Sequence, residues 1–331
     1  MFIDILTLAF GLLLILFAAE LFTNSVEFIG DKLDLSKNFT GSVLAAVGTA
    51  LPESILPVIA ILFFSNKAGH EIGIGAILGA PFMLSTLAFP LIGLTVIVAY
   101  LLKKRDLELN IEEIGLRRDI VFFLFGYSIA LFLIPFEADI LKPITAVFLL
   151  ILYVIYVILT LRSESAEMEE AHNLYLAKGG IKENLTVAFI QLFSSLIIMI
   201  MGAHIFVDGI GKLSSIIGIS PLIFSLLLAP IATELPEKVN SVLWVLRGKD
   251  TLAVGNVSGA MVFQSTIPVS IGILLTDWNL DKLALASGVL AIISGFLILI
   301  ISYFNKRFIP FGFSIGIIFY IFYIVLVINS V

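Results

Sequence analysis

Gly48-Thr49-Ala50-Leu51-Pro52-Glu53 is a polar stretch inside a long apolar segment, and Ala232-Thr233-Glu234-Leu235-Pro236-Glu237 repeats it later in the chain. The first copy lies within the apolar segment 39–64, and the second lies within 221–246. A carboxylate inside such a segment is costly, and it usually marks a pathway for ions or protons. Two copies at corresponding places therefore predict one transport site built from both.

The local chemistry of each copy suits a cation. The threonine and the last glutamate are four residues apart, so they share a helix face. The proline between them has no amide hydrogen and leaves a main-chain carbonyl without its usual donor, and Pro230 does the same just before the second copy. Carboxylate, hydroxyl and carbonyl oxygens are the ligands of hard cations such as Na⁺ and Ca²⁺. The alternative is that each proline only kinks its helix and each glutamate meets another polar group.

The composition indicates a polytopic membrane protein. Of the 331 residues, 60% are hydrophobic and only 13% are charged. The absence of cysteine excludes disulfides, thiolate metal sites and thiol catalysis. The first apolar segment is too long for a cleavable signal and contains Glu20 and Glu27, so we interpret it as a retained helix. We expect no nucleic-acid partner, no obligate protein partner and no bound cofactor; the expected partners are inorganic cations and the lipid bilayer.

Windows of about 20 apolar residues define candidate membrane spans. Ten are predicted, at about 4–29, 39–65, 72–102, 118–135, 139–161, 184–211, 220–246, 251–276, 282–304 and 309–329. The third is longer than one straight crossing needs, and its glycines and prolines predict a broken or strongly tilted helix.

The loops between these spans predict the orientation and the division of the chain. Fourteen of the 19 Lys and Arg residues fall in loops after odd-numbered spans, four fall after even-numbered spans, and Lys238 lies inside a span. The positive-inside rule then places both termini outside and the loop between spans five and six in the cytoplasm. We expect a first five-helix repeat at 1–161, a cytoplasmic linker at 162–183 and a second five-helix repeat at 184–331, in the cell membrane. Five spans per half make equivalent helices run in opposite directions, which is an inverted repeat.

The repeat can be followed beyond the two glutamate motifs. Ala19-Glu20-Leu21-Phe22 aligns with Ala203-His204-Ile205-Phe206, and Gly75 and Gly79 align with two glycines of the second half, Gly255 and Gly259. Small residues at such positions favour close helix packing. The fold class predicted from the residues is thus an all-α membrane protein of ten helices in a 5+5 arrangement.

With these motifs, the sequence resembles the cation/Ca²⁺ exchanger superfamily, and the sodium/calcium exchangers in particular. Each half of that family carries Gly-Thr-Ser-Leu-Pro-Glu followed by Gly-Asn-x-x-Gly-Ser-Asn, which residues 48–53 with 75–80 and residues 232–237 with 255–259 match in part. The resemblance implies a sodium/calcium exchanger-like fold and a secondary active antiporter, not an enzyme. It also implies exchange of Ca²⁺ against Na⁺ by alternating access at a site near mid-membrane.

The resemblance also assigns roles to residues. It implies that Glu53 and Glu237 are the central cation ligands, with Thr49 and Thr233 beside them, and that the main-chain carbonyls of Ala46 and Pro230 line outer sites. Two further candidate ligands stand at family ligand positions with altered side chains, namely Glu234 and Gln264.

Other family ligand positions hold side chains that cannot coordinate a cation, namely Ala50, Ala80, Leu84 and Ala260. Most side-chain ligands for outlying Na⁺ sites are therefore missing. This leaves two alternatives open: an exchanger coupled to protons or otherwise atypical, and a transport-inactive scaffold. An intramembrane hydrolase is disfavoured, because the chain lacks Gly-x-Ser-x-Gly and His-Glu-x-x-His motifs.

Two local features remain open. Glu234 and Lys238 are four residues apart with the acid first, so they can pair along a helix. Either Lys238 only neutralises Glu234, or its ammonium lies near Glu237 and stands in for a bound cation. The hydroxyl pairs Ser85-Thr86 and Ser265-Thr266 either supply replacement ligands or hydrogen-bond back to their own helices.

Overall fold

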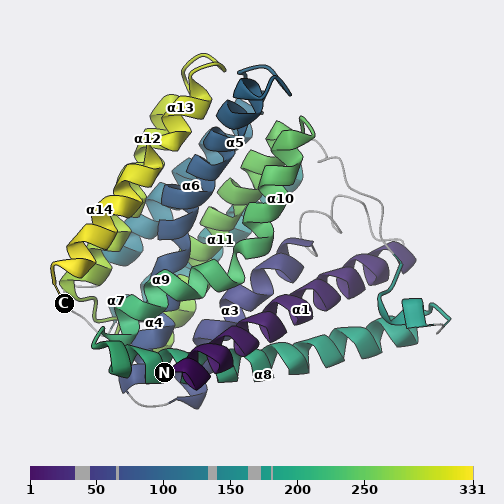
Figure 1. The fold of residues 1–331 in the computed structure, drawn as a ribbon, viewed down its shortest axis with the longest axis vertical. Helices are drawn as coiled ribbons and strands as arrows, with labels where there is room; N and C mark the ends of the chain where they lie inside the picture. The colour runs from purple at the N-terminus through teal and green to yellow at the C-terminus, as the bar shows by residue number, and fades with distance from the viewer. Residues whose placement is uncertain (34–44, 65–66, 133–139, 163–172, 180–181, 331) are drawn as a thin grey trace.

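The computed structural model describes residues 1–33, 45–64, 67–132, 140–162, 173–179 and 182–330, without the side chains of 45–51, 161–162, 178–179, 232, 236 and 237. Within these ranges the chain is mostly helical and contains no strand (Figure 1). The elements are α1 (Phe2–Lys32), α3 (Ala45–Phe63), α4 (Lys67–Met83), the π-helical η2 (Leu84–Ala88), α5 (Phe89–Leu101), α6 (Glu113–Phe132), α7 (Leu141–Arg162), the 3₁₀ turn η4 (Leu176–Gly179), α8 (Leu185–Ile217), α9 (Pro221–Thr233), α10 (Leu235–Leu246), α11 (Asp250–Leu275), α12 (Lys282–Ile301), α13 (Ile309–Ser314) and α14 (Gly316–Ile328).

Local sequence sets several helix ends. The Asn184 side chain accepts a hydrogen bond from the Val187 amide at the start of α8, at 2.9 Å. Gly218 ends α8 with φ at +81°, a left-handed conformation that favours glycine. The Ser220 hydroxyl accepts from the Ile223 amide at 3.3 Å and starts α9. Each cap satisfies main-chain groups that have no partner within the helix.

Helices α1 and α8 lie side by side along their length and are inclined to the bundle formed by the other long helices (Figure 1). Their backbones approach closely at Gly11 and Gly202. A Cβ atom on Gly11 would lie 2.7 Å from the amide nitrogen of Phe206, and one on Gly202 would lie 3.0 Å from the Gly11 carbonyl oxygen. The pair is thus packed through glycine, as close approach of membrane helices requires.

Helices α4 and α9 form a second close pair. A Cβ atom on Gly75 or on Gly79 would lie 2.2 Å from a main-chain carbonyl oxygen of α9, in the first case that of Leu222. The Ser225 hydroxyl of α9 donates to the Ile72 carbonyl of α4 at 2.8 Å. The predicted use of these glycines for close packing is therefore confirmed for the first half.

The predicted third span is helical throughout, from Lys67 to Leu101, and contains the π-helical segment η2 rather than a break. Pro90 has no amide hydrogen to donate to the Thr86 carbonyl, so the α-helical pattern cannot continue there. The Phe89 amide instead bonds to the Leu84 carbonyl, five residues back. One wide turn accommodates the proline while the helix continues.

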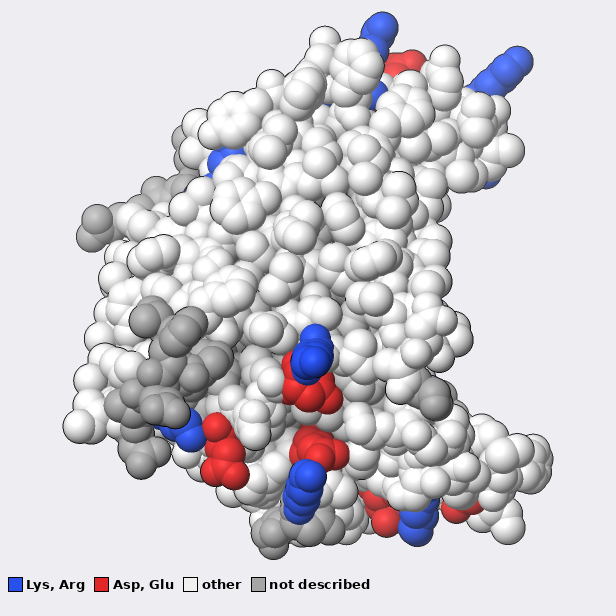
Figure 2. All heavy atoms as spheres, turned by 90° about the vertical axis from the view of Figure 1, so that its left-hand side faces the viewer, with Lys and Arg blue, Asp and Glu red and all other residues white. Residues whose placement is uncertain are grey.

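Seven helices among the described residues have the length and apolar composition to cross a membrane. They are Phe2–Lys32, Lys67–Leu101, Leu141–Thr160, Leu185–Ile217, Asp250–Leu275, Lys282–Ile301 and Ile309–Ile328; shorter apolar helices cover Pro52–Phe63 and Pro221–Ile231. Figure 2 shows an uncharged belt across one face, with charged side chains above and below it. The count of ten spans stays a prediction.

The helix that contains most of the fourth predicted span begins before the predicted start of that span. Helix α6 starts at Glu113, so Arg117 and Arg118 lie inside the helix and not in the preceding loop. Arg117 binds the far end of α12: its guanidinium donates to the Ser302 carbonyl at 2.5 Å and stacks 3.9 Å from the centre of the Tyr303 ring. These contacts explain how a cation is tolerated within the helix.

A short segment of the predicted linker is bound to both α1 and α8. The Tyr175 amide donates to Asn24 Oδ1 at 3.1 Å, and the Leu176 amide donates to Gln191 Oε1 at 3.0 Å. Gln191 Nε2 also donates to Asn24 Oδ1 at 2.9 Å, and both side chains are buried. We call these four residues the linker clasp, because they join α1, α8 and the linker in one hydrogen-bonded group.

Tyr175 also reaches a carboxylate of α1. Its hydroxyl donates to Glu20 Oε1 at 2.6 Å. This hydrogen bond to the Glu20 carboxylate raises the pKa of Tyr175 to about 12. The phenol therefore stays protonated and continues to donate up to a higher pH than an ordinary tyrosine.

Candidate cation-binding site

Helix α3 carries the first glutamate motif and places Glu53 in the protein interior. Pro52 and Pro57 both lie inside α3, which continues past them to Phe63. Glu53 is only 7% exposed. One turn further on, Leu56 packs into an apolar cluster that α1, α4 and α8 also build. A carboxylate in such surroundings needs a polar or charged partner.

Gln264 of α11 is a partner of Glu53. Its Nε2 donates a short hydrogen bond to Glu53 Oε2, and the Gln264 side chain is 1% exposed. Among the described residues, no donor reaches the other amide atom, Gln264 Oε1. The site therefore contains a carboxylate beside a buried amide oxygen that is available to a further donor or to a cation.

The second glutamate motif interrupts its helix, in contrast to the first. Helix α9 ends at Thr233 and α10 begins at Leu235, with Glu234 between them at φ −96° and ψ 6°. The Thr233 hydroxyl is buried and donates to the Ala229 carbonyl at 3.2 Å. The interruption places main-chain carbonyls of α9 and amides of α10 at one point, which is a common construction for ion sites in transporters.

An ion pair occupies this interruption. Glu234 is fully buried, and Lys238 Nζ lies 3.0 Å from Glu234 Oε2. The same Nζ donates to the Pro230 carbonyl oxygen at 3.3 Å. Within the described part of the chain, Glu234 Oε1 accepts no hydrogen bond. The predicted pairing of Glu234 with Lys238 is confirmed, and the ammonium has a second contact that the sequence did not predict.

The other predicted ligands are placed only in part. Thr49 and Ala46 lie in α3 and Glu237 lies in α10, but their side chains are outside the described residues. The convergence of Glu53 and Glu237 on one ion therefore stays a prediction. The structure brings together Glu53 with Gln264, and Glu234 with Pro230.

The two hydroxyl pairs make the hydrogen bonds to their own helices that one of the two alternatives predicted. Ser85 and Thr86 both donate to the Phe82 carbonyl, at 3.1 Å and 2.5 Å. Ser265 and Thr266 likewise donate to the carbonyl of Val262, at 3.0 Å and 2.7 Å. All four hydroxyls hydrogen-bond back to their own helices, as serine and threonine often do in membrane helices.

One buried polar contact was not expected from the sequence. Asp119 of α6 is 4% exposed and accepts a hydrogen bond from the Ser258 hydroxyl of α11 at 2.6 Å. Arg118 Nη2 lies 3.1 Å from the other carboxylate oxygen. Ser258 belongs to the glycine motif of the second half, so this contact holds α6 against the helix that carries Gln264. The sequence feature that could have indicated this contact is the acidic residue Asp119 in an otherwise apolar segment.

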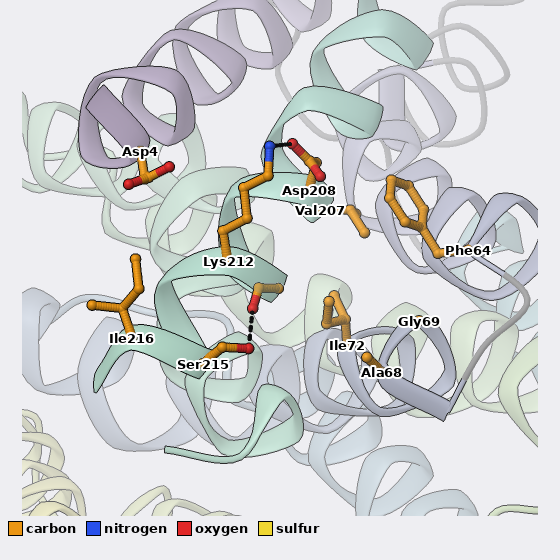
Figure 3. A pocket seen from close by; sticks show the side chains of 11 residues that line it. Asp4, Phe64, Ala68, Gly69, Ile72, Val207, Asp208, Lys212, Ser215 and Ile216 are labelled. Carbon is orange, nitrogen blue, oxygen red and sulfur yellow. Dashed lines mark hydrogen bonds and ion pairs between the residues drawn. The ribbon is translucent and has the colours of Figure 1, made fainter. Parts of the chain in front are cut away.

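A pocket of about 490 Å³ lies between α1, α4 and α8 (Figure 3). It is lined by Asp4, Phe64, Ala68, Gly69, Ile72, Val207, Asp208, Gly211, Lys212, Ser215 and Ile216. Figure 3 shows the Lys212 ammonium pointing to Asp208. Lys212 Nζ lies 2.6 Å from Asp208 Oδ2. This lining includes neither Glu53 nor Gln264, so the pocket is a different place in the fold.

Comparison with known proteins gives one family match and several relatives. The family model described as "Sodium/calcium exchanger protein" matches residues 3–162 and 187–331. Over 295 residues the chain is 28% identical to the uncharacterized membrane protein MJ0091 of Methanocaldococcus jannaschii, and the alignment covers 88% of each chain.

Two solved structures share the fold. The crystal structure of the H⁺/Ca²⁺ exchanger CAX superposes with a TM-score of 0.68 at 20% identity, covering 98% of this chain and 88% of the other. A structure of the sodium-calcium exchanger NCX_Mj superposes with a TM-score of 0.58 at 23% identity, covering 99% and 98%.

Proposed function

Because the chain belongs to the sodium/calcium exchanger protein family, we propose that it is a secondary active antiporter that exchanges Ca²⁺ against Na⁺. Families of this description consist of membrane transporters and not of enzymes. The proposed cargo is Ca²⁺ in one direction and Na⁺ in the other, at a site built around Glu53 and Glu237. No cofactor takes part in the proposed cycle, because the ions themselves are the substrates.

The observation that carries the proposal is the contact between Glu53 and Gln264. It joins α3 of the first predicted half to α11 of the second, within an apolar interior. Two ionised carboxylates left without a cation in such surroundings are costly, and a divalent ion or two monovalent ions remove that cost. Passage through the empty state is thereby disfavoured, and exchange of one cargo for the other is favoured.

We propose the architecture that the sequence predicted, with ten membrane helices in two inverted five-helix repeats. The repeats occupy 1–161 and 184–331, and residues 162–183 form a cytoplasmic linker, with both termini outside the cell membrane. In this arrangement α1 and α8 are equivalent helices, and their close glycine-mediated packing supports joint movement across the remaining bundle. Such sliding would expose the site to alternate sides.

The second candidate is coupling to protons instead of Na⁺. It is favoured by the replacement of hydroxyl and amide ligands at Ala50, Ala80, Ala260 and Leu84, which leaves fewer oxygens for separate Na⁺ ions. The four hydroxyls beside these positions donate their hydrogens to carbonyls of their own helices. A carboxylate such as Glu53 can bind a proton without any further ligand, whereas a metal ion needs several oxygens.

The test is uptake of radiolabelled Ca²⁺ into proteoliposomes that contain the purified protein. An outward Na⁺ gradient is imposed first, and an outward H⁺ gradient at constant Na⁺ second. Uptake driven by Na⁺ alone supports the first candidate, and uptake driven by H⁺ alone supports the second. Absence of uptake under both gradients, with Ca²⁺ still raising the unfolding temperature, contradicts antiport and leaves a transport-inactive scaffold.

A further inference from the structure

The Lys238 ammonium is held by the oxygens that a small cation would use. One is a carboxylate oxygen of Glu234 at 3.0 Å, and the other is the Pro230 carbonyl oxygen at 3.3 Å. Glu234 is fully buried and Lys238 is 12% exposed, so water contributes little to this group. The remaining oxygen, Glu234 Oε1, has no hydrogen-bond donor among the described residues.

The helix interruption adds a favourable field for a positive charge. Pro230 begins the last turn of α9, which ends at Thr233. The carbonyl groups at a helix C-terminus carry partial negative charge and attract cations. The carbonyl of Pro230 already accepts the Glu234 amide at 3.1 Å, and the ammonium is its second donor. A carboxylate and a helix C-terminus thus converge on one positive charge.

We propose that Lys238 is a tethered cation, whose ammonium fills a monovalent-cation site formed by the Glu234 carboxylate and the Pro230 carbonyl. This inference rests on the proposed function, and it names a determinant of how many ions move in each cycle. Because the ammonium is covalently attached, it neutralises Glu234 in every state of the protein. The mobile ions then balance only the two central carboxylates, Glu53 and Glu237.

Removal of the tethered charge gives a specific expectation. With Lys238→Met, Glu234 stays buried beside the Pro230 carbonyl without a cation, and a free monovalent ion is required in its place. Lys238→Gln removes the positive charge as Lys238→Met does, but its side-chain amide can still donate to the Pro230 carbonyl. The double variant Glu234→Gln/Lys238→Met removes both charges, so its charge balance is again that of the unaltered chain.

The first measurement is thermal unfolding of the purified proteins in choline chloride with increasing NaCl, LiCl or KCl, which requires no transport. We expect Lys238→Met and Lys238→Gln to gain a saturable increase in unfolding temperature with at least one of these cations, beyond any response of the unaltered protein. The double variant should lack this gain. If both single variants respond as the unaltered protein does, Lys238 only neutralises Glu234 and the inference is wrong.

The second measurement is Ca²⁺ flux in proteoliposomes at membrane potentials clamped with valinomycin and K⁺. The single variants should carry one additional monovalent charge per Ca²⁺ ion, and the double variant should carry the same charge as the unaltered protein. An unchanged charge per cycle in the single variants contradicts the inference. If the unaltered protein moves no Ca²⁺, the proposed function fails, while the unfolding measurement still decides the role of Lys238.

The unfolding measurement also covers a single variant that is unfolded in choline chloride. Recovery of the folded state by a monovalent cation supports the inference, and a variant that no cation recovers contradicts it.

Discussion

Gln264 on α11 donates its Nε2 hydrogen to the carboxylate of Glu53 on α3, across 211 residues of sequence. The two side chains are 1% and 7% exposed. They come from the two predicted halves of the chain, and each stands at a position that the family resemblance assigned to cation binding. Their contact links the first glutamate motif to α11 of the second predicted half.

Replacement of Glu53 by glutamine should abolish Ca²⁺ uptake. The variant keeps the size of the side chain but removes the negative charge that a divalent cation requires. Uptake into proteoliposomes under the coupling gradient is the measurement. Glu112→Gln is the matched control, because Glu112 is an exposed carboxylate at the start of α6. Uptake by Glu53→Gln at the rate of this control would contradict the assignment of the site.

Replacement of Gln264 by leucine should weaken Ca²⁺ binding without abolishing it. The change removes the hydrogen bond to Glu53 and the buried amide oxygen, both within reach of a bound ion. Loss of a group that orients a metal ligand typically lowers affinity by about 10- to 100-fold. Isothermal titration with Ca²⁺ measures the change. Ser265→Ala is the control, since that hydroxyl bonds to its own helix, and equal affinities in the two variants would refute a role for Gln264.

Gly75→Ala should destabilise the protein, and Gly255→Ala should not. The two glycines occupy equivalent positions in the predicted repeat, but a Cβ atom on Gly75 would lie 2.2 Å from the Leu222 carbonyl oxygen. At Gly255 the same atom meets nothing within 4 Å among the described residues. Overpacking of this kind costs about 1–3 kcal/mol. Thermal unfolding in detergent should show the difference, and equal unfolding temperatures would contradict the close packing of α4 against α9.

Asn24→Leu should loosen the attachment of the linker clasp to α1, although the Tyr175 hydroxyl keeps its bond to Glu20 and Gln191 Nε2 keeps its bond to the Leu21 carbonyl. The change leaves the Tyr175 amide and Gln191 Nε2 without the acceptor that they share. The expected local cost is about 1–2 kcal/mol, which corresponds to about 5- to 30-fold faster amide exchange at Tyr175. Hydrogen exchange with mass spectrometry measures this rate. Ser25→Ala is the control because its hydroxyl bonds within α1, and unchanged exchange in Asn24→Leu would show that the clasp does not hold the linker.

Several features of the fold could be predicted from the sequence because they depend on neighbours in the chain. Asn184, Ser220 and Gly218 cap helices through residues at most four positions away. The Glu234–Lys238 pair follows from the spacing of one helical turn. By contrast, the third predicted span, expected to be broken or strongly tilted, is a continuous helix with a π-helical turn before Pro90, which has no amide hydrogen to donate.

The sequence by itself determined that this is a membrane protein, that a glutamate motif occurs twice along the chain, and that the chain resembles the exchanger family. Hydrophobicity, motif spacing and loop charge are properties of the linear chain, so they need no coordinates. Only the tertiary structure decided that Gln264 reaches Glu53, that Asp119 holds Ser258, and that the Lys238 ammonium contacts the Pro230 carbonyl. The first two contacts join helices that are distant in the chain, and the third depends on where the helix is interrupted. All three depend on how the backbone packs, which the spacing of residues in the sequence does not encode.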